Sequence, residues 1–595
     1  MKRLYIATAT IILIAIGSSC SKSFLETHPQ GVITEDKLGT TTAVEDALVA
    51  AYGIMNGNIN GTWGNYAAAP SQWEFGDIGA DNAHKGSDYS DQGYINDIEG
   101  HQATSLNDQT PNMWKVYYEG VIRCNTTLRL LNALQSGSST EKFSDTRAKE
   151  IEAEAKLLRA HYYFFLCRVF SGKIPYIDEN MTTAEATNVT NDSDIYPKIE
   201  ADLQFAVANM PQDYSKPGDG TVGRGDLYAA KAYLGKVYLY EKKYSEALAL
   251  FKDVINEKGD LTAMKFQNNF DVKTKNGPEG IFVVQDIINP DGSGDNANVG
   301  DMLSGFYGSA PISCCGFDLP SYDLVNAFRV DANGLPLGVG PNDNVTGGIP
   351  NAAAYRANPY LSDLKNPTTS YKVDTTIAFD PRLDYTVGRR GVNYRDWGVM
   401  PGTAWIRNAA SASQFVNYKS MVDEADFGSY TVPGTAEITA QNINIIRLAD
   451  VYLMAAECAI ETNDLASALK WVNAVRTRAA TLPAVLTPSG NPAAVYRVKP
   501  YPSFPSQDYA RAAVRTERRL ELAQEGHRFF DLVRWGIAKT VLESYHNFEK
   551  QYTAAASGSG VASYSFDDSK DDYMPIPQVE MDESGGVLKP NGYGH

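Results

Sequence analysis

The chain has 595 residues, 43% of them hydrophobic and 21% charged, which are the values of a globular protein with a large core. Its formal net charge of −18 repels phosphate backbones, so no nucleic-acid partner is expected. The 35 tyrosines suit a surface that grips a polar, partly apolar ligand, because a phenol offers both a stacking face and a hydroxyl group.

The N-terminus has the pattern of an export signal. Two basic residues precede an apolar run at 4–16, and small residues then lead to Cys20. This order predicts a lipoprotein signal peptide over 1–19, with Cys20 as the lipidated residue that anchors the protein to a membrane. Ordinary secretion, with cleavage near Ser19, is the alternative. No later stretch is long and apolar enough to span a bilayer, so we expect a protein that sits on the membrane.

Long loops follow a polar tether at 20–35 and one predicted helix at 42–55. Residues 56–110 are rich in Gly, Asn and Asp, and they include the polar run 76–94. A loop region of this length inside a globular protein is usually functional.

Helical periodicity returns after these loops and again near the C-terminus. Leu234, Ala247 and Phe251 follow the spacing of a tetratricopeptide unit, and the segment 447–480 aligns with that unit. Small residues in the second unit allow two helices to approach closely. Other predicted helices span 113–134, 144–170, 194–210 and 510–525.

The helical period fails between 259 and 444, where Gly, Pro, Asn and Asp separate short β-like runs such as 280–287. This block is rich in aromatic residues and predicts an irregular subdomain laid across the helices.

The six cysteines form no regular framework. Cys124, Cys167 and Cys458 are predicted to be small buried residues on helices. The adjacent Cys314 and Cys315 are expected not to bond each other easily, because such a bond would be strained.

The run 515–536, RTERRLELAQEGHRFFDLVRWG, is the densest group of charged and aromatic residues in the chain. A functional interpretation makes His527 a general base beside Glu525 or Asp531, but a base also needs a nucleophile or water, an orienting group and a cleft. In the structural interpretation, apolar residues supply a core, charged residues pair, and Gly526 ends a helix. The spacing favours this ion-paired helix junction.

Aromatic and polar residues in the loops are the candidates for ligand binding. The apolar face of a sugar ring stacks on an indole or a phenol, while its hydroxyl groups form hydrogen bonds with Asp, Asn, Arg and Lys. For any single loop aromatic, local packing is the competing explanation. The predicted ligand-binding residues are Trp73, Asp81, Asn82, Lys85, Tyr89, Tyr307, Trp397 and Trp405.

Known catalytic and metal-binding patterns do not occur in the sequence. The seven histidines are scattered, and there is no HExxH, GxSxG or P-loop pattern. Carboxylate pairs abound in so acidic a chain, so a glycosidase dyad remains an alternative. The oxygen-rich run 291–301 lacks EF-hand spacing and is interpreted as a solvated loop. No catalytic residue, metal or cofactor is therefore predicted.

Several segments resemble the SusD/RagB family of outer-membrane nutrient-binding lipoproteins of Bacteroidetes-type bacteria. They are CSKSFLETHPQGVIT, EAKLLRAHYYFFLCRVFSGKIPYI, RLADVYLMAAECA, NAVRTRA, ERRLELAQEGHRFFDLVRWG and MPIPQVEMD. The resemblance runs from Cys20 to about Asp582, and the closing ESGGVLKPNGYGH follows the family's usual Asn-Pro close only loosely.

The resemblance implies a mainly α fold, in which tetratricopeptide-like helix pairs form a right-handed superhelical scaffold with a loop-rich face. We expect one domain at 36–595, with the scaffold mainly at 113–258 and 444–540 and ligand-binding insertions at 56–110 and 259–443. The family implies a lipid-anchored, non-enzymatic protein on the outer membrane, facing the cell exterior. Such proteins present oligosaccharides to a SusC-type TonB-dependent transporter. Alternatives are a peptide-binding member of the family, a surface glycoside hydrolase, and a purely structural lid.

Overall fold

The computed structural model describes residues 39–59, 65–212, 222–288, 297–307, 314–340, 345–364, 370–409, 412–432, 438–553 and 564–595. The predicted signal peptide, the lipidated Cys20 and the tether lie outside these ranges, as does most of the run 291–301.

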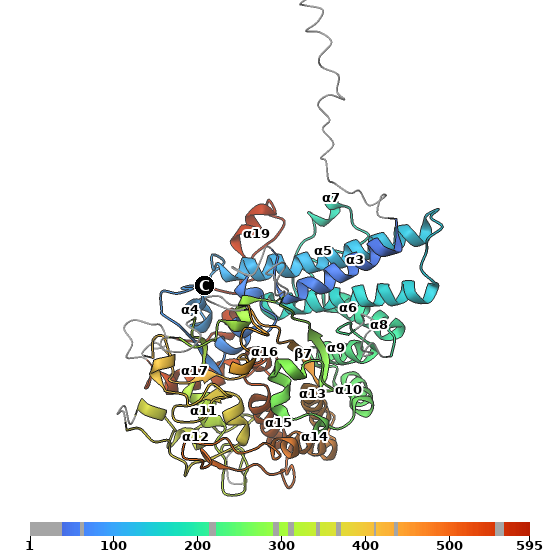
Figure 1. Ribbon diagram of the computed structural model, residues 1–595. Coiled ribbons are helices and arrows are strands. Elements are labelled where there is room, and N and C mark those ends of the chain that lie inside the picture. The colour runs from blue at the N-terminus through green and yellow to red at the C-terminus, as the bar shows by residue number, and fades with distance from the viewer. Residues whose placement is uncertain are drawn as a thin grey trace, which may run out of the picture.

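A continuous series of helices forms one side of the molecule (Figure 1). Each helix packs on the next one in the chain, from α3 through α5, α6, α8, α9, α10 and α13 to α14 and α15. The prediction of a mainly α fold with packed helix pairs is confirmed. The helices are α3 (Thr41–Gly53), α5 (Gln109–Ser136), α6 (Asp145–Phe170), α8 (Tyr196–Asn209), α9 (Leu227–Tyr240), α10 (Tyr244–Lys258), α13 (Leu448–Glu461), α14 (Leu465–Ala479) and α15 (Gln507–Leu522).

Local sequence explains where these helices begin and how they pair. The side chains of Ser144, Asp226 and Ser506 each accept a hydrogen bond from the backbone N–H three residues later, at 2.8–3.2 Å, and so cap α6, α9 and α15. Gly235 of α9 faces Phe251 of α10, where a Cβ would lie 2.6 Å from the ring. The small and aromatic residues of the tetratricopeptide spacing therefore set the approach of the two helices.

Helix α6 is deeply buried in its second half, where every residue from Leu157 to Phe170 is buried. Two of its arginines, Arg159 and Arg168, are buried and held by different partners. The Arg159 guanidinium donates to both carboxylate oxygens of Asp202 at 2.7 and 2.8 Å. Arg168 lies 4.2 Å from the ring centroids of both Phe165 and Phe530, so the cation is held between two aromatic faces. The predicted burial of the three helical cysteines, Cys124, Cys167 and Cys458, is also confirmed.

The rest of the described chain is loop-rich, with short elements gathered around α11, α12 and α17 (Figure 1). Its strands pair two by two: β1 (Ala83–Gly86) with β3 (Phe317–Pro320), β2 (Gly280–Val284) with β7 (Ile443–Arg447), β4 (Ala378–Phe379) with β8 (Val495–Tyr496), and β5 (Val387–Gly388) with β6 (Val416–Asn417). Only the β4–β8 pair is parallel among these. The β1–β3 pair joins the loop 76–94 to the central block, so the two predicted insertions meet in space.

Short helices complete the loop-rich part. A π-helix, η4 (Trp73–Ile78), stands where only loop was predicted. The other short helices are α4 (Ile95–Glu99), α7 (Thr183–Ala186), α11 (Tyr322–Ala327), α12 (Ala352–Arg356), α16 (Arg528–Arg534), α17 (Ala538–Glu549), α18 (Asp568–Asp571) and α19 (Gln578–Glu583).

The end of α15 corrects the prediction that Gly526 terminates the helix. The helix ends at Leu522, four residues earlier. Gly526 has a φ of 70°, and a Cβ on it would lie 1.8 Å from the carbonyl oxygen of Ser71. Its N–H donates to the Asp77 carboxylate at 2.7 Å. Glycine is therefore required there by close contact with η4 and the residues before it, and not by helix capping.

The structure joins the sulfur atoms of Cys314 and Cys315 in a disulfide, and the expectation that such a bond is strained stays a prediction. The peptide bond between these residues is cis, and it places their Cα atoms 3.0 Å apart.

Candidate functional site

The run 515–536 is an ion-paired junction, as predicted. Arg518 donates to Asp450 and to Asp531, each at 2.8 Å, and links α15 to α13 and α16. His527 is buried, and burial together with the nearby Lys236 ammonium lowers its pKa to about 3. The imidazole is therefore neutral, and its supposed partners are occupied: Asp531 binds Arg518, while Glu525 binds Arg447 at 2.8 Å. The base interpretation of His527 finds no support in this geometry.

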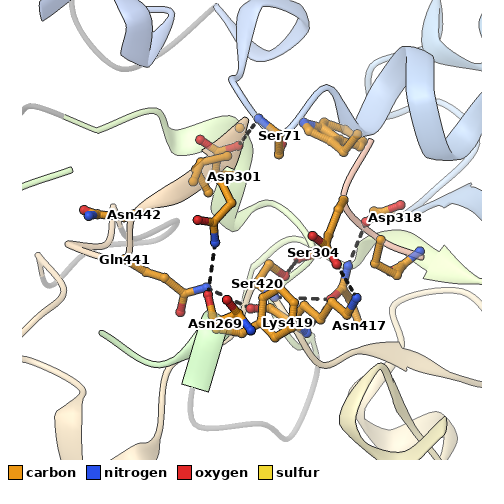
Figure 2. A pocket seen from close by; sticks show the side chains of 17 residues that line it. Ser71, Asn269, Asp301, Ser304, Asp318, Asn417, Lys419, Ser420, Gln441 and Asn442 are labelled. Atoms are coloured by element: carbon orange, nitrogen blue, oxygen red, sulfur yellow. Dashed lines mark hydrogen bonds and ion pairs between the residues drawn. The ribbon is translucent and has the colours of Figure 1, made fainter. Parts of the chain in front are cut away.

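A small polar cavity lies beside η4 and is lined by residues from several distant loops (Figure 2). Ser71 and Asp301 line one part of it, and Gln441, Lys419 and Asn417 line another. Its volume is about 60 Å³. That volume holds roughly two water molecules and is far below the ~300–1,000 Å³ of typical ligand pockets.

Several polar atoms around this cavity have no hydrogen-bond partner in the described part of the chain. They include the indole N–H of Trp73, Oε1 of Gln441 and Oδ2 of Asp301. Burial raises the pKa of Asp301 to about 7, and burial with the neighbouring Asp77 raises the pKa of Asp318 well above its usual value. The cavity thus offers both donors and acceptors, which suits ordered water or the hydroxyl groups of a ligand.

Three of the predicted residues, Lys85, Tyr89 and Tyr307, lie close to Arg407, which contacts Tyr307 directly and binds Ser87 and Asp91, chain neighbours of the other two. The guanidinium of Arg407 lies 5.1 Å from the Tyr307 ring centroid and pairs with Asp91 at 2.5 Å. The Lys85 ammonium lies 5.9 Å from the Tyr89 ring centroid and donates to the Tyr89 carbonyl oxygen at 3.1 Å. We call Lys85, Tyr89, Asp91, Tyr307 and Arg407 the tyrosine surface.

Exposure makes the tyrosine surface available to a ligand. Tyr89 is 46% exposed and Tyr307 is half-buried, whereas Lys85 is buried. Burial lowers the pKa of Lys85 to about 8, although nearby carboxylates, led by Glu99, oppose this. Phenol rings beside a guanidinium and a carboxylate are the groups that stack on a sugar ring and bind its hydroxyls. Sequence reasoning missed Arg407, since nothing in its local pattern WIRN marks it.

The two predicted tryptophans of the central block pack mainly against protein. Trp405 is buried and stacks on Phe306, with ring centroids 4.2 Å apart. Trp397 is half-buried, and its indole N–H donates to the carbonyl oxygen of Val422 at 2.9 Å. The backbone N–H of Tyr307 donates to the Trp405 carbonyl oxygen. The buried Trp405 therefore holds the backbone of the tyrosine surface at Tyr307.

The remaining predicted residues are buried. Asp81 binds the Arg528 guanidinium through both carboxylate oxygens, at 2.7 and 2.9 Å. Asn82 accepts from Arg519 at 3.1 Å and donates to Asp77 at the same distance. Trp73 lines the polar cavity and meets Phe317 edge to face. Direct ligand contact by these residues stays a prediction, and the side chains of Asp81 and Asn82 are already bound by arginines.

The run 291–301 is interpreted above as solvated, but the described end of that run is not. Asp301 is buried and faces the polar cavity. Within the described ranges, no group of three or more His, Cys, Asp or Glu side chains is placed to hold a metal ion. No described helix has the length and apolar character needed to cross a membrane.

The helical scaffold with a loop-rich face defines a class of helical-repeat protein, and family models identify the family. The model described as "SusD family" matches residues 278–594. A second model, described as "Starch-binding associating with outer membrane", matches residues 33–239. The chain therefore belongs to the SusD family, as the sequence resemblance predicted.

Individual relatives agree with this assignment over nearly the whole chain. A SusD-like protein of Bacteroides ovatus is 25% identical over 550 residues, which cover 90% of this chain and 82% of the relative. SusD-like protein P25 of Formosa agariphila is 24% identical over 603 residues, covering 98% of both chains.

Solved structures show the same fold. A laminarin-binding SusD-like protein superposes with a TM-score of 0.63 at 24% identity, covering 93% of this chain and all of the other. Surface glycan-binding protein A of Bacteroides thetaiotaomicron, in complex with laminarihexaose, gives 0.62 at 19% identity with the same coverage. These neighbours have tetratricopeptide-like helical folds, which confirms the predicted fold class.

Proposed function

We propose that this protein is a cell-surface lipoprotein that binds oligosaccharides and delivers them to a SusC-type TonB-dependent outer-membrane transporter. The observation that carries the proposal is the tyrosine surface on the loop-rich face of a SusD-family chain. Related proteins of the same fold are named for binding laminarin or other glycans. Binding uses Tyr89 and Tyr307 as stacking faces and Arg407 with Asp91 as hydrogen-bond partners, and it breaks no covalent bond.

Binding is tested by calorimetry of the protein with laminarihexaose, maltohexaose and a mixture of short peptides. Affinity for either glycan, with no change in the glycan after incubation, supports the proposal. Peptide binding without any glycan binding would instead favour a peptide-uptake member of the family. Turnover of a bound glycan would show that the protein is an enzyme.

The anchor and the partner need separate tests. A Cys20→Ser chain expressed in a host that processes lipoproteins should lose incorporation of an alkyne-labelled fatty acid and leave the membrane fraction. Affinity purification of the intact lipoprotein should recover a TonB-dependent transporter. A labelled, membrane-bound Cys20→Ser chain would refute anchoring through this residue.

A further inference from the structure

A second, larger cavity lies on the other side of the run 515–536, between α12, α15, α16 and α17. Its volume is about 290 Å³, close to the ~300 Å³ lower limit of typical ligand pockets. Ala353, Thr540 and Ser544 at its mouth are exposed, whereas Arg519 and Arg528 in its lining are buried. The cavity is therefore open to solvent at one end and ends on guanidinium groups.

Four arginines line this cavity, which we call the arginine pocket: Arg356, Arg515, Arg519 and Arg528. Among the described residues of the lining, Asp81 is the only carboxylate. A further carboxylate, Asp323, lies outside the lining and pairs with Arg356 and Arg519. Four cations thus meet two anions, and this excess of positive charge stands in a chain whose formal net charge is −18.

Two of these arginines leave a guanidinium nitrogen without a partner. Arg528 binds Asp81 through Nε and Nη2, and its Nη1 has no hydrogen bond to any described residue. Arg356 binds Asp323 through Nε and Ser544 through Nη1, and its Nη2 likewise has no hydrogen bond to the described chain. Arg519, by contrast, uses all three of its nitrogens on protein atoms.

Arg515 differs most from the paired arginines. Its Nη1 donates to the carbonyl oxygen of Gly348 at 2.9 Å, and its guanidinium lies 5.1 Å from the Trp535 ring centroid. It forms no ion pair with any carboxylate of the described residues. Arg515 and Arg519 are four residues apart on α15 and so share one face of the helix. A partly buried arginine held in place by carbonyls and an indole is preorganised to receive an oxyanion.

The walls of the pocket suit a sugar better than a flexible chain. Ile349, Ala352 and Val541 provide apolar surface, and Thr540 and Ser544 provide hydroxyl groups. Small apolar patches flanked by hydroxyls match the alternating faces of a pyranose ring.

From this geometry we propose that the arginine pocket binds one acidic sugar unit, whose carboxylate or sulfate ester is held by Arg515, Arg528 and Arg356. This inference rests on the proposed glycan-binding function and adds that the ligand is anionic. The proposal also distinguishes two sites. The tyrosine surface stacks on the sugar rings of the glycan, and the arginine pocket binds its anionic group.

The test is calorimetry or ligand-observed NMR with glucuronate, glucose 6-sulfate, glucose and sodium sulfate as probes. We expect at least one of the two anionic sugars to bind and glucose not to bind. Glucuronate and glucose 6-sulfate distinguish a carboxylate from a sulfate ester as the source of the oxyanion. Equal binding of glucose and its anionic counterparts would overturn the proposal, and so would binding of sodium sulfate without either acidic sugar.

Variants on one helix provide the matched control. Arg515→Gln should weaken the acidic sugar about tenfold or more, and Arg515→Lys by less. Arg511→Gln should have no effect, because Arg511 points to Glu461 at 2.7 Å and lies outside the pocket. Unchanged affinity in Arg515→Gln would refute the assignment.

Laminarihexaose separates the two proposals. Its binding should not change in Arg515→Gln, because a neutral glycan needs only the tyrosine surface. If the acidic monosaccharides bind but laminarihexaose and maltohexaose do not, the proposed uptake function fails while the pocket assignment stands. If laminarihexaose binds and the acidic sugars do not, the pocket fails alone.

Discussion

The arginines around α15 occupy two opposite surroundings. On one side lies a buried ion-pair cluster made of Arg382, Arg447, Arg476, Arg478, Glu279, Glu517, Glu521 and Glu525. This cluster has as many arginines as glutamates, and each arginine pairs with at least one glutamate. On the other side lies the arginine pocket, where arginines outnumber carboxylates. A balanced cluster holds segments together, whereas an excess of one charge beside an open cavity prepares a surface for a ligand.

The difference also explains how one family-signature run serves two purposes. Glu521 faces the cluster and forms ion pairs with Arg382 at 3.0 Å and with Arg447 at 2.7 Å. Arg515 and Arg519 face the pocket from the same helix. The first face joins β7, α14 and the 3₁₀ helix at 381–385 to α15. The second is free to contribute to recognition.

Replacing Glu521 by Gln should have the largest effect on stability. Burial raises the pKa of Glu521, but Arg478, Arg447 and Arg382 outweigh this and hold it well below its usual value, so the carboxylate is ionised. Removing it leaves buried guanidiniums without their shared partner, which costs about 3–5 kcal/mol. Chemical denaturation should show this loss.

The matched control for Glu521 is Glu583→Gln, an exposed glutamate at the end of α19. It should change stability by less than about 0.5 kcal/mol. If both variants unfold at the same denaturant concentration, the cluster does not hold the scaffold together.

The contact between η4 and the run 515–536 predicts the next largest effect. Gly526→Ala would place a Cβ 1.8 Å from the Ser71 oxygen, on a residue with a φ of 70°. We expect a loss of about 3 kcal/mol or more, because the backbone must shift. Gly536→Ala is the control: its φ is also positive, at 65°, but no atom lies within 4 Å. It should cost only about 1–2 kcal/mol.

These two glycines also show how far sequence reasoning reaches. Periodicity predicted the helices well, because it depends on neighbours in the chain, as does the observed cap that Ser144 gives to α6. The prediction that Gly526 ends a helix was wrong, because the need for glycine comes from close contact with Ser71, which is far away in the sequence. The π-helix at 73–78 was not predicted for the same reason: its contacts with α16, α4, β1 and β3 are distant in the sequence, and no local pattern marks it.

The candidate site was predictable only by region. The segments 76–94 and 300–405 do meet, through the pairing of β1 with β3. Which aromatics stay exposed was not predictable, because a distant residue, Phe306, covers Trp405, whereas Tyr89 is 46% exposed. The arginine pocket was missed because its charges come from 81, 356 and 515–528. The one local signal was a pair of arginines four residues apart on α15.

Two buried histidines with opposite surroundings predict the pH dependence of stability. Burial lowers the pKa of His84, but Glu549 and Glu99 outweigh it and raise the pKa to about 10. A raised pKa gives stability that is complete below the unfolded value of about 6.5 and is lost as the pH rises toward 10. His527, with a pKa of about 3, instead costs stability as the pH falls from 6.5 toward 3.

The measurement is the free energy of unfolding at several pH values between 7 and 9.5. In His84→Gln the decline of stability over this window should be shallower, by up to about 1.4 kcal/mol per pH unit. His527→Gln is the control, since its titration lies below pH 6.5 and should leave this slope unchanged. Parallel curves for the parent and His84→Gln would show that His84 is not charged between its two glutamates.

The smallest effect concerns the tyrosine surface, where stability and binding should separate. Tyr89 is 46% exposed, so Tyr89→Ala should change stability by less than about 0.5 kcal/mol. It removes a stacking face worth about 0.5–1.5 kcal/mol, which is a 2- to 12-fold loss of laminarihexaose affinity. Tyr430→Ala, at a tyrosine that is 37% exposed and outside this surface, should bind as the parent does. Equal losses in both variants would mean that exposed phenols act generally, and that the grouping around Arg407 does not define the site.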